Sequence, residues 1–236
     1  RHAMSVTTRR FAVATLFTGV IAGLVGLACI HLLHWIQALA WDMHSGTLLE
    51  AVSAASPARR VLILSLGGIL GGASWFFLFR RSRAVTSVSA AVGGTPMPPL
   101  RATWHALTQV LIVSLGASVG REVAPREMAA AFSAAAADRL GLTPEDRRII
   151  VACGAGAGLA AVYSIPMSGA IYTLEILLVS RSRRAVAAAF CTSAIAVLIS
   201  TGFTRPAPFY TVPALTPSLS LTVFAALVGP LLGATG

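Results

Sequence analysis

Long apolar runs, separated by short polar or basic segments, fill this sequence. The run Phe11–Trp41 contains no Asp, Glu, Lys or Arg and could cross a hydrocarbon core of ~30 Å even when strongly tilted. Further apolar runs lie at Val61–Phe79, Thr103–Val119 and Ala185–Thr204. Because runs of this length need lipid or a large core to cover them, the pattern predicts an all-α polytopic membrane protein.

Composition and charge support this prediction. The chain of 236 residues is 56% hydrophobic and only 11% charged, and all 18 basic side chains are Arg. The Arg residues lie between the apolar runs, where they determine topology, and not on one polar face, so we expect no nucleic-acid partner. Arg9 and Arg10 precede the first run. We therefore expect residues 1–10 to be a cytoplasmic N-terminal segment of a multi-pass protein in the cell (inner) membrane.

The cysteines, histidines and possible nucleophiles of this sequence are not spaced as they are in metal sites or active sites. Cys29, Cys153 and Cys191 lie in apolar segments without metal-ligand spacing, so we expect small core residues, no metal and no cofactor. His31 and His34 lack a nearby third ligand and are predicted to be interfacial or structural. No nucleophile–base pair or HExxH motif is present at usable spacing, so the sequence does not predict an enzyme.

The segment Gly116–Met128 concentrates charge inside an apolar sequence. Gly120 permits a turn, and Pro125 suits the first turn of a helix that we predict over Ala124–Ala137. The free N–H groups and the dipole at such a helix start favour an anion, and Glu122 lies directly before it. The spacing fits an anion site, and it fits equally a charged cytoplasmic turn beside an ordinary span.

Two further breaks interrupt the apolar pattern. The segment Ala91–Arg101 contains Gly93, Gly94 and three prolines around Thr95, which is typical either of a plain loop or of non-helical backbone that lines a cavity. The segment Tyr163–Pro166 separates two short apolar helices predicted over Arg147–Ala161 and Met167–Val179, as in discontinuous transporter helices. Glu175, within the second, is either functional or an interfacial partner of a nearby Arg.

Three motifs resemble the first half of the CLC family of chloride channels and chloride/proton antiporters. Gly94-Thr95-Pro96-Met97-Pro98 resembles the family's G-S-G-I-P, and Gly120-Arg121-Glu122-Val123-Ala124-Pro125 resembles its G-R-E-G-P with one extra residue. Ala152–Glu175 is similar, without gaps, to A-x-G-A-A-A-G-L-A-A-A-F-x-A-P-L-A-G-x-x-F-x-x-E. The resemblance implies a CLC-like inverted-repeat fold of broken, tilted helices with only the first repeat present. Residues 11–218 would form that repeat, and 219–236 would begin a second, truncated one.

The resemblance also implies roles for individual residues. The Thr95 hydroxyl and the backbone N–H groups of Val123 and Ala124 would contact the anion, and Glu122 would be the gate that carries a proton. Ile176 stands where the family's antiporters usually have an internal glutamate, which leaves Glu175 as the candidate internal proton relay. The supporting residues would be Gly94, Gly120, Arg121 and Pro125.

The function implied by the resemblance is transport of chloride or a similar small halide across the lipid bilayer by a homodimer. Glu122 would gate the pore, and the isoleucine at position 176 implies weak or altered coupling to protons. Two alternatives are a fluoride/proton antiporter of the divergent CLC branch and a non-transporting membrane subunit.

Overall fold

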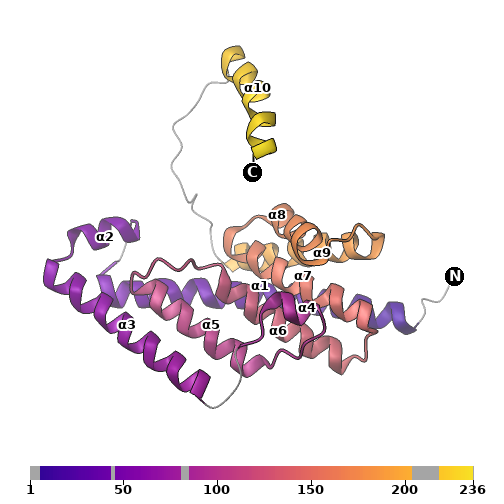
Figure 1. Ribbon diagram of the computed structural model, residues 1–236, viewed down its shortest axis with the longest axis horizontal. Coiled ribbons are helices and arrows are strands. Elements are labelled where there is room, and N and C mark those ends of the chain that lie inside the picture. The colour runs from indigo at the N-terminus through magenta and orange to yellow at the C-terminus, as the bar shows by residue number, and fades with distance from the viewer. Residues whose placement is uncertain (1–5, 44–45, 81–84, 204–217, 236) are drawn as a thin grey trace. The chain divides into compact units, whose positions relative to one another are not determined.

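The computed structural model describes residues 6–43, 46–80, 85–203 and 218–235, which fall in two compact units, Arg1–Arg205 and Pro206–Gly236. Within the described ranges the chain forms ten α-helices and one π-helix (Figure 1). Their bounds are α1 Val6–Trp41, α2 Leu48–Ala54, α3 Pro57–Arg80, α4 Val88–Val92, α5 Pro99–Ser114, α6 Val123–Arg139, α7 Pro144–Tyr163, α8 Pro166–Ile171, η1 Tyr172–Leu178, α9 Arg183–Phe203 and α10 Leu219–Thr235.

Three helices of the described part of the chain, α1, α3 and α9, are long and apolar enough to cross a membrane. Large apolar side chains on them, such as Phe17, Ile69 and Leu198, are exposed, as lipid-facing side chains are. The predicted apolar runs are therefore helical. Helix α1 begins at Val6, so part of the predicted N-terminal segment 1–10 is helical, and residues 1–5 lie outside the described residues. The Pro-rich loop predicted over residues 205–218 lies almost wholly outside them.

Glycines on α1 let it pack closely on two other helices. A side chain at Gly19 or Gly23 would collide with Ile195 or Ala196 on α9, and one at Gly26 would collide with Ala161 on α7. These glycines, spaced three or four residues apart, therefore serve contacts within the chain.

Helix α7 is buried along most of its length, and its small residues serve two opposite neighbours. Gly154 and Gly158 face α6, where an added Cβ would meet Ser133 and the carbonyl oxygen of Pro125. Gly156 faces α8 and η1, where it would meet Thr173 and the carbonyl oxygen of Gly169. Because small residues alternate along α7, its backbone can contact neighbouring helices on two opposite sides.

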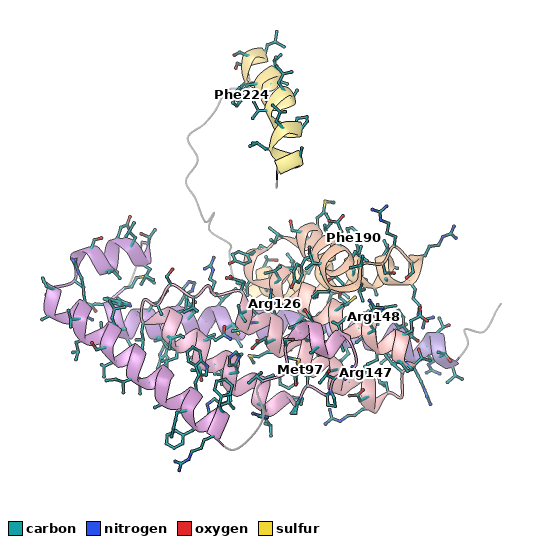
Figure 2. The ribbon with its side chains drawn as sticks, viewed as in Figure 1. Met97, Arg126, Arg147, Arg148, Phe190 and Phe224 are labelled. Atoms are coloured by element: carbon teal, nitrogen blue, oxygen red, sulfur yellow. The ribbon has the colours of Figure 1, made fainter. Side chains whose placement is uncertain are left out.

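The start of α7 is fixed by capping and by arginine. Thr143 followed by Pro144 is a sequence that predicts a helix start, and the structure has it: Thr143 accepts a hydrogen bond from the Asp146 N–H at 3.2 Å. Arg147 pairs with Asp138 at 2.6 Å, and Arg148 donates to the carbonyl oxygen of Leu178 at 2.9 Å (Figure 2). These contacts join the first turn of α7 to the ends of α6 and η1.

Three features differ from the sequence-based expectations. The polar connection Asp42–Arg60 contains the short helix α2, which begins with a capping box between Thr47 and Glu50. The apolar piece after Pro166 turns into a π-helix at Tyr172 and ends at Val179, a β-branched residue with φ +48°. Cys29 and Cys153 are buried as predicted, whereas Cys191 is exposed, because α9 turns its small residues Ala188, Thr192 and Ala196 toward the core.

Candidate functional site at the start of α6

Helix α6 starts at the charged motif, close to the predicted position. Gly120 adopts φ +77°, a left-handed conformation that favours glycine, and Glu122 follows as the N-cap residue. The helix runs over Val123–Arg139, one residue earlier and two residues later than predicted. The turn at Gly120 is what lets the chain enter α6 with Glu122 at its tip.

The backbone N–H groups at the start of α6 are candidate donors to a ligand. The first N–H groups of an α-helix have no partner within the helix, and the Glu122 side chain makes no capping hydrogen bond to them. Pro125 is buried in this first turn and has no N–H group. The donors that remain ahead of the regular helical bonding are therefore those of Val123 and Ala124, together with that of Glu122 itself. The N–H groups of Val123 and Ala124 are the two backbone donors to which the family resemblance assigns the anion.

The Glu122 carboxylate turns back over Gly120 and toward α7. Its oxygens lie against the Gly120 backbone, where a Cβ at position 120 would collide with them. The Tyr163 hydroxyl donates a hydrogen bond of 3.3 Å to Oε2 of Glu122. Glu122 is therefore held at the helix tip by a single long side-chain bond from the last turn of α7.

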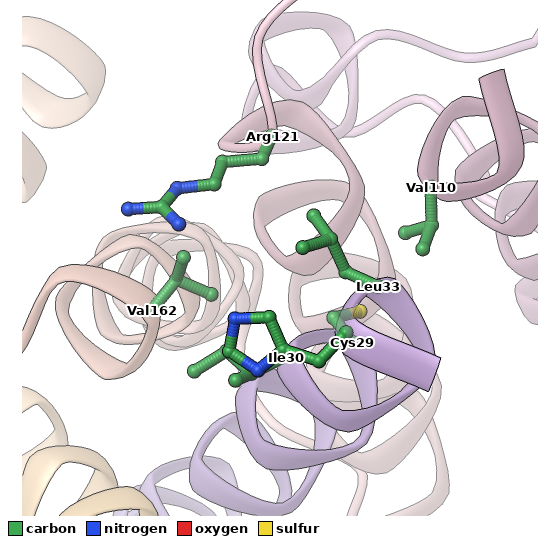
Figure 3. Close-up of a pocket in the computed structure, with 7 residues that line it drawn as sticks. Cys29, Ile30, Leu33, Val110, Arg121 and Val162 are labelled. Carbon is green, nitrogen blue, oxygen red and sulfur yellow. The ribbon is translucent and has the colours of Figure 1, made fainter. Parts of the chain in front are cut away.

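Arg121 flanks the same tyrosine. Its guanidinium lies 5.2 Å from the centroid of the Tyr163 ring, within the range of a cation–π contact. It also lines a cavity of about 20 Å³, enough for one water molecule, together with Val162 and side chains from α1 such as Cys29 and Leu33 (Figure 3). Arg121 thus places a positive charge beside the group that holds Glu122.

A second arginine lies one turn into α6. Arg126 donates to the Tyr172 hydroxyl at 3.1 Å, and its guanidinium lies 5.7 Å from the centroid of that ring. Its Nε atom is buried without a hydrogen-bond partner, and no carboxylate of the described chain pairs with it. Residues 122 and 126 are four positions apart on α6, so they project from the same side of the helix.

The Thr95 loop forms a separate part of the candidate site. Gly94 adopts φ +104°, and the Thr95 N–H donates to the carbonyl oxygen of Ala90, so this donor is already used. The Thr95 side chain is exposed, while Met97 is buried in a core cluster with Ala130 and other residues of α6. Within the described residues, no hydrogen bond joins Thr95 to Glu122, whereas the structure does join Glu122 to Tyr163.

Glu175 and Ile176 lie on the π-helix and are both exposed. Thr173 and Leu178 are the buried residues of this segment, and their spacing of five matches the π-helical repeat. Among the described residues Glu175 forms no ion pair with Arg181 or Arg183, so the alternative of an interfacial ion pair is not observed. No group of three His, Cys, Asp or Glu in the described ranges could hold a metal ion.

Sequence reasoning missed the two tyrosines of the site. The sequence places Tyr163 in a break between two helices and Tyr172 in the motif Ala152–Glu175, and it gives neither residue a role. Each lies about 40 residues or more from its partner, Glu122 or Arg126, so no local spacing could reveal the contact. The usable signal was the presence of two hydroxyl-bearing aromatic residues beside the break at Pro166.

Comparison with known proteins gives consistent matches. The family described as voltage gated chloride channel matches residues 67–236. The voltage-gated ClC-type chloride channels ClcB of Escherichia coli O81 (strain ED1a) and of Shigella boydii serotype 18 are each 30% identical over 198 residues. These matches cover 81% of this chain and 47% of each relative, so the chain spans about half the length of the curated relatives it matches.

A solved structure shares the fold. The crystal structure of a slow cyanobacterial Cl⁻/H⁺ antiporter matches with a TM-score of 0.73 and 18% identity, over 96% of this chain and 54% of that one. The all-α membrane fold predicted from the sequence is thereby confirmed. With a family match over most of its length and relatives at 30% identity, this chain belongs to the CLC family of voltage-gated chloride channels.

Proposed function

We propose that this protein moves chloride or a similar small halide across the cell (inner) membrane, through a path in which Glu122 is the gate. The proposal rests on one observation: Glu122 stands at the N-cap of α6, its carboxylate makes no capping bond, and its side chain is held by Tyr163 over 3.3 Å. A carboxylate beside N–H groups that it does not itself cap would compete with an anion for them.

The physical basis is competition for the helix tip. The N–H groups of Val123 and Ala124 and the positive end of the helix dipole stabilise one negative charge, whether a carboxylate or a halide. Protonation of Glu122 would remove its charge and with it the competition for those donors, and the carboxyl group could then carry the proton away from the tip. Thr95 would supply a hydroxyl from the separate loop, and Gly94, Gly120, Arg121 and Pro125 would hold these groups in place.

Proton coupling is proposed to be weak or altered. The relay position of the family's antiporters is taken by Ile176, and its neighbour Glu175 is exposed on the π-helix. Passive flow or loosely coupled exchange therefore accounts for the sequence better than tight exchange does. The relatives are described as chloride channels and the structural neighbour as a Cl⁻/H⁺ antiporter, which supports both forms of the proposal. The functional unit is proposed to be a homodimer.

The decisive experiment is flux through the complete protein reconstituted in liposomes. Glu122→Gln mimics the protonated gate, so anion flux should persist while any proton movement driven by the anion gradient is lost. Glu145→Gln, an exposed change in the first turn of α7, is the matched control and should behave like the wild type. Unchanged proton movement in the Glu122 variant, or absence of anion flux in the wild type, would contradict the proposal.

A further inference from the structure

Helices α5 and α6 bury an acid–base pair that the proposed gate does not use. Nδ1 of His105 lies 2.6 Å from Oε2 of Glu127, and the two side chains are only 17% and 12% exposed. Nε2 of Gln109, one turn along α5, lies 3.0 Å from the same Nδ1 atom. Ionisable side chains inside a helix bundle are costly, so a pair retained there usually has a function.

The groups around the pair do not neutralise it. The Trp75 ring of α3 covers His105, with its centroid 6.2 Å away. The nearest arginines in sequence are directed elsewhere: Arg101 donates to the carbonyl oxygen of Leu78 and Arg126 to the Tyr172 hydroxyl. Helices that contact α5 or α6 carry further titratable groups, among them Cys29, His31 and His34 on α1 and Glu145, Asp146, Cys153 and Tyr163 on α7. Among the described residues, no hydrogen bond or ion pair joins any of these to His105 or Glu127.

The contact between His105 and Glu127 fits two protonation states of the pair, which differ by one proton. In the first, neutral His105 donates its Nδ1 hydrogen to an ionised Glu127, and the pair carries one negative charge. In the second, Glu127 is protonated and donates to Nδ1, while the imidazole carries its hydrogen on Nε2 and the pair is neutral. Nδ1 has a single lone pair, which the Glu127 O–H occupies in the second state, so Gln109 contacts the pair at Nδ1 without selecting one state.

The position of the pair separates it from the gate. Glu127 lies five residues after Glu122 on α6, which is about 7.5 Å along the helix toward its Arg139 end. Five residues also turn it by about 140° at 3.6 residues per turn, away from the side that carries Glu122 and Arg126. The pair can therefore change its protonation without moving the Glu122 side chain.

We propose that His105 and Glu127 form a proton-binding site inside the helix bundle, which takes up and releases one proton as a unit. On uptake a proton bonds to Nε2 of His105 and the Nδ1 hydrogen passes to the Glu127 carboxylate, so that the new O–H donates to the vacated Nδ1. Proton binding by this pair does not depend on the proposed transport function. A contribution of the pair to proton coupling would rest on that function.

The test is infrared difference spectroscopy of the complete protein in lipid between about pH 5 and about pH 8, a range that spans histidine titration. The wild type should show the carbonyl band of a buried protonated carboxylic acid at the acidic end. That band should disappear in Glu127→Gln and persist in Glu122→Gln and in the exposed control Glu145→Gln. An unchanged band in Glu127→Gln, or a wild type without one, would overturn the proposal.

A second measurement uses the wild type, so that it tests the site even if Glu127→Gln does not fold. The imidazole bands in the same spectra should change from the Nδ1–H tautomer to the Nε2–H tautomer as the carboxylic acid band appears. Imidazole bands that stay unchanged would contradict the inferred site. Failure of anion flux in liposomes would instead contradict the proposed function and leave this titration unaffected.

Discussion

The Tyr163 hydroxyl at the end of α7 and the Glu122 carboxylate at the start of α6 are hydrogen-bonded over 3.3 Å, across 41 positions of sequence. The same tyrosine ring lies under the Arg121 guanidinium. One aromatic side chain therefore contacts both charged residues of the motif that resembles G-R-E-G-P. How firmly it holds Glu122 should decide how easily an anion replaces the carboxylate.

Removing that hydroxyl should favour the anion. Tyr163→Phe keeps the ring under Arg121 and removes the hydroxyl that donates to Glu122, a bond whose net contribution is about 0.5–1.5 kcal/mol. We expect the apparent affinity for chloride or bromide to rise about two- to tenfold, as measured by calorimetric titration of the purified protein. Tyr172→Phe, which removes the hydroxyl bonded to Arg126, is the control and should not show this rise. Equal affinities in the wild type and Tyr163→Phe would rule out a holding role for Tyr163.

A side chain at position 120 should disturb both the fold and the gate. Gly120→Ala places a Cβ in a left-handed conformation and into the Glu122 carboxylate, so we expect a loss of about 1–2 kcal/mol in stability and altered anion affinity. The control is Gly72→Ala in α3, where an added Cβ meets nothing within 4 Å and should stabilise the helix by about 0.5–1 kcal/mol. Thermal unfolding in one detergent compares the two, and equal stability would argue against this account of the turn.

The positive charge of Arg126 should assist anion binding at the helix tip. Its guanidinium has no carboxylate partner among the described residues and projects from the same side of α6 as Glu122. Arg126→Gln should weaken halide binding by about 1 kcal/mol, or about fivefold, if the charge acts across a partly shielded interior. Arg139→Gln, exposed at the far end of α6, should leave binding unchanged. The same titrations measure both, and equal losses in both variants would count against a local effect.

The residue after the π-helix is predicted to be strained. Val179 has φ +48° and ψ +48°, a left-handed conformation that costs an L-residue about 1–2 kcal/mol. Val179→Gly should therefore raise the stability of the protein by about 1 kcal/mol, seen as a higher unfolding temperature. Val186→Gly, inside α9, should lower it by about 1 kcal/mol or more. Destabilisation by both substitutions would show that the strain at Val179 is not relieved.

The elements that the sequence predicts well depend on local chemistry. The cap at Thr143, the turn at Gly120 and the break before Pro166 follow from what those residues allow the backbone to do, and the structure has each of them. The apolar runs likewise become the long helices, because their length and lack of charge suit a membrane.

The contacts that the sequence does not predict are long-range or depend on small energy differences. The pairs Tyr163–Glu122 and His105–Glu127 join residues 41 and 22 positions apart, which no periodicity connects. The π-helix differs from an α-helix by one residue per turn, which the apolar pattern of Tyr172–Leu178 does not distinguish. The exposure of Cys191 depends on which side of α9 faces α1 and α7.

The glycines of α7 limit how the proposed gate could open. Because Gly158 meets the backbone of Pro125 directly, and Gly156 meets that of Gly169 on the opposite side, α7 leaves its neighbours no room to slide. A swing of the whole first turn of α6 would force main chain into main chain. Passage of an ion should therefore require only torsional rotation about the bonds of one glutamate, with the surrounding scaffold almost stationary.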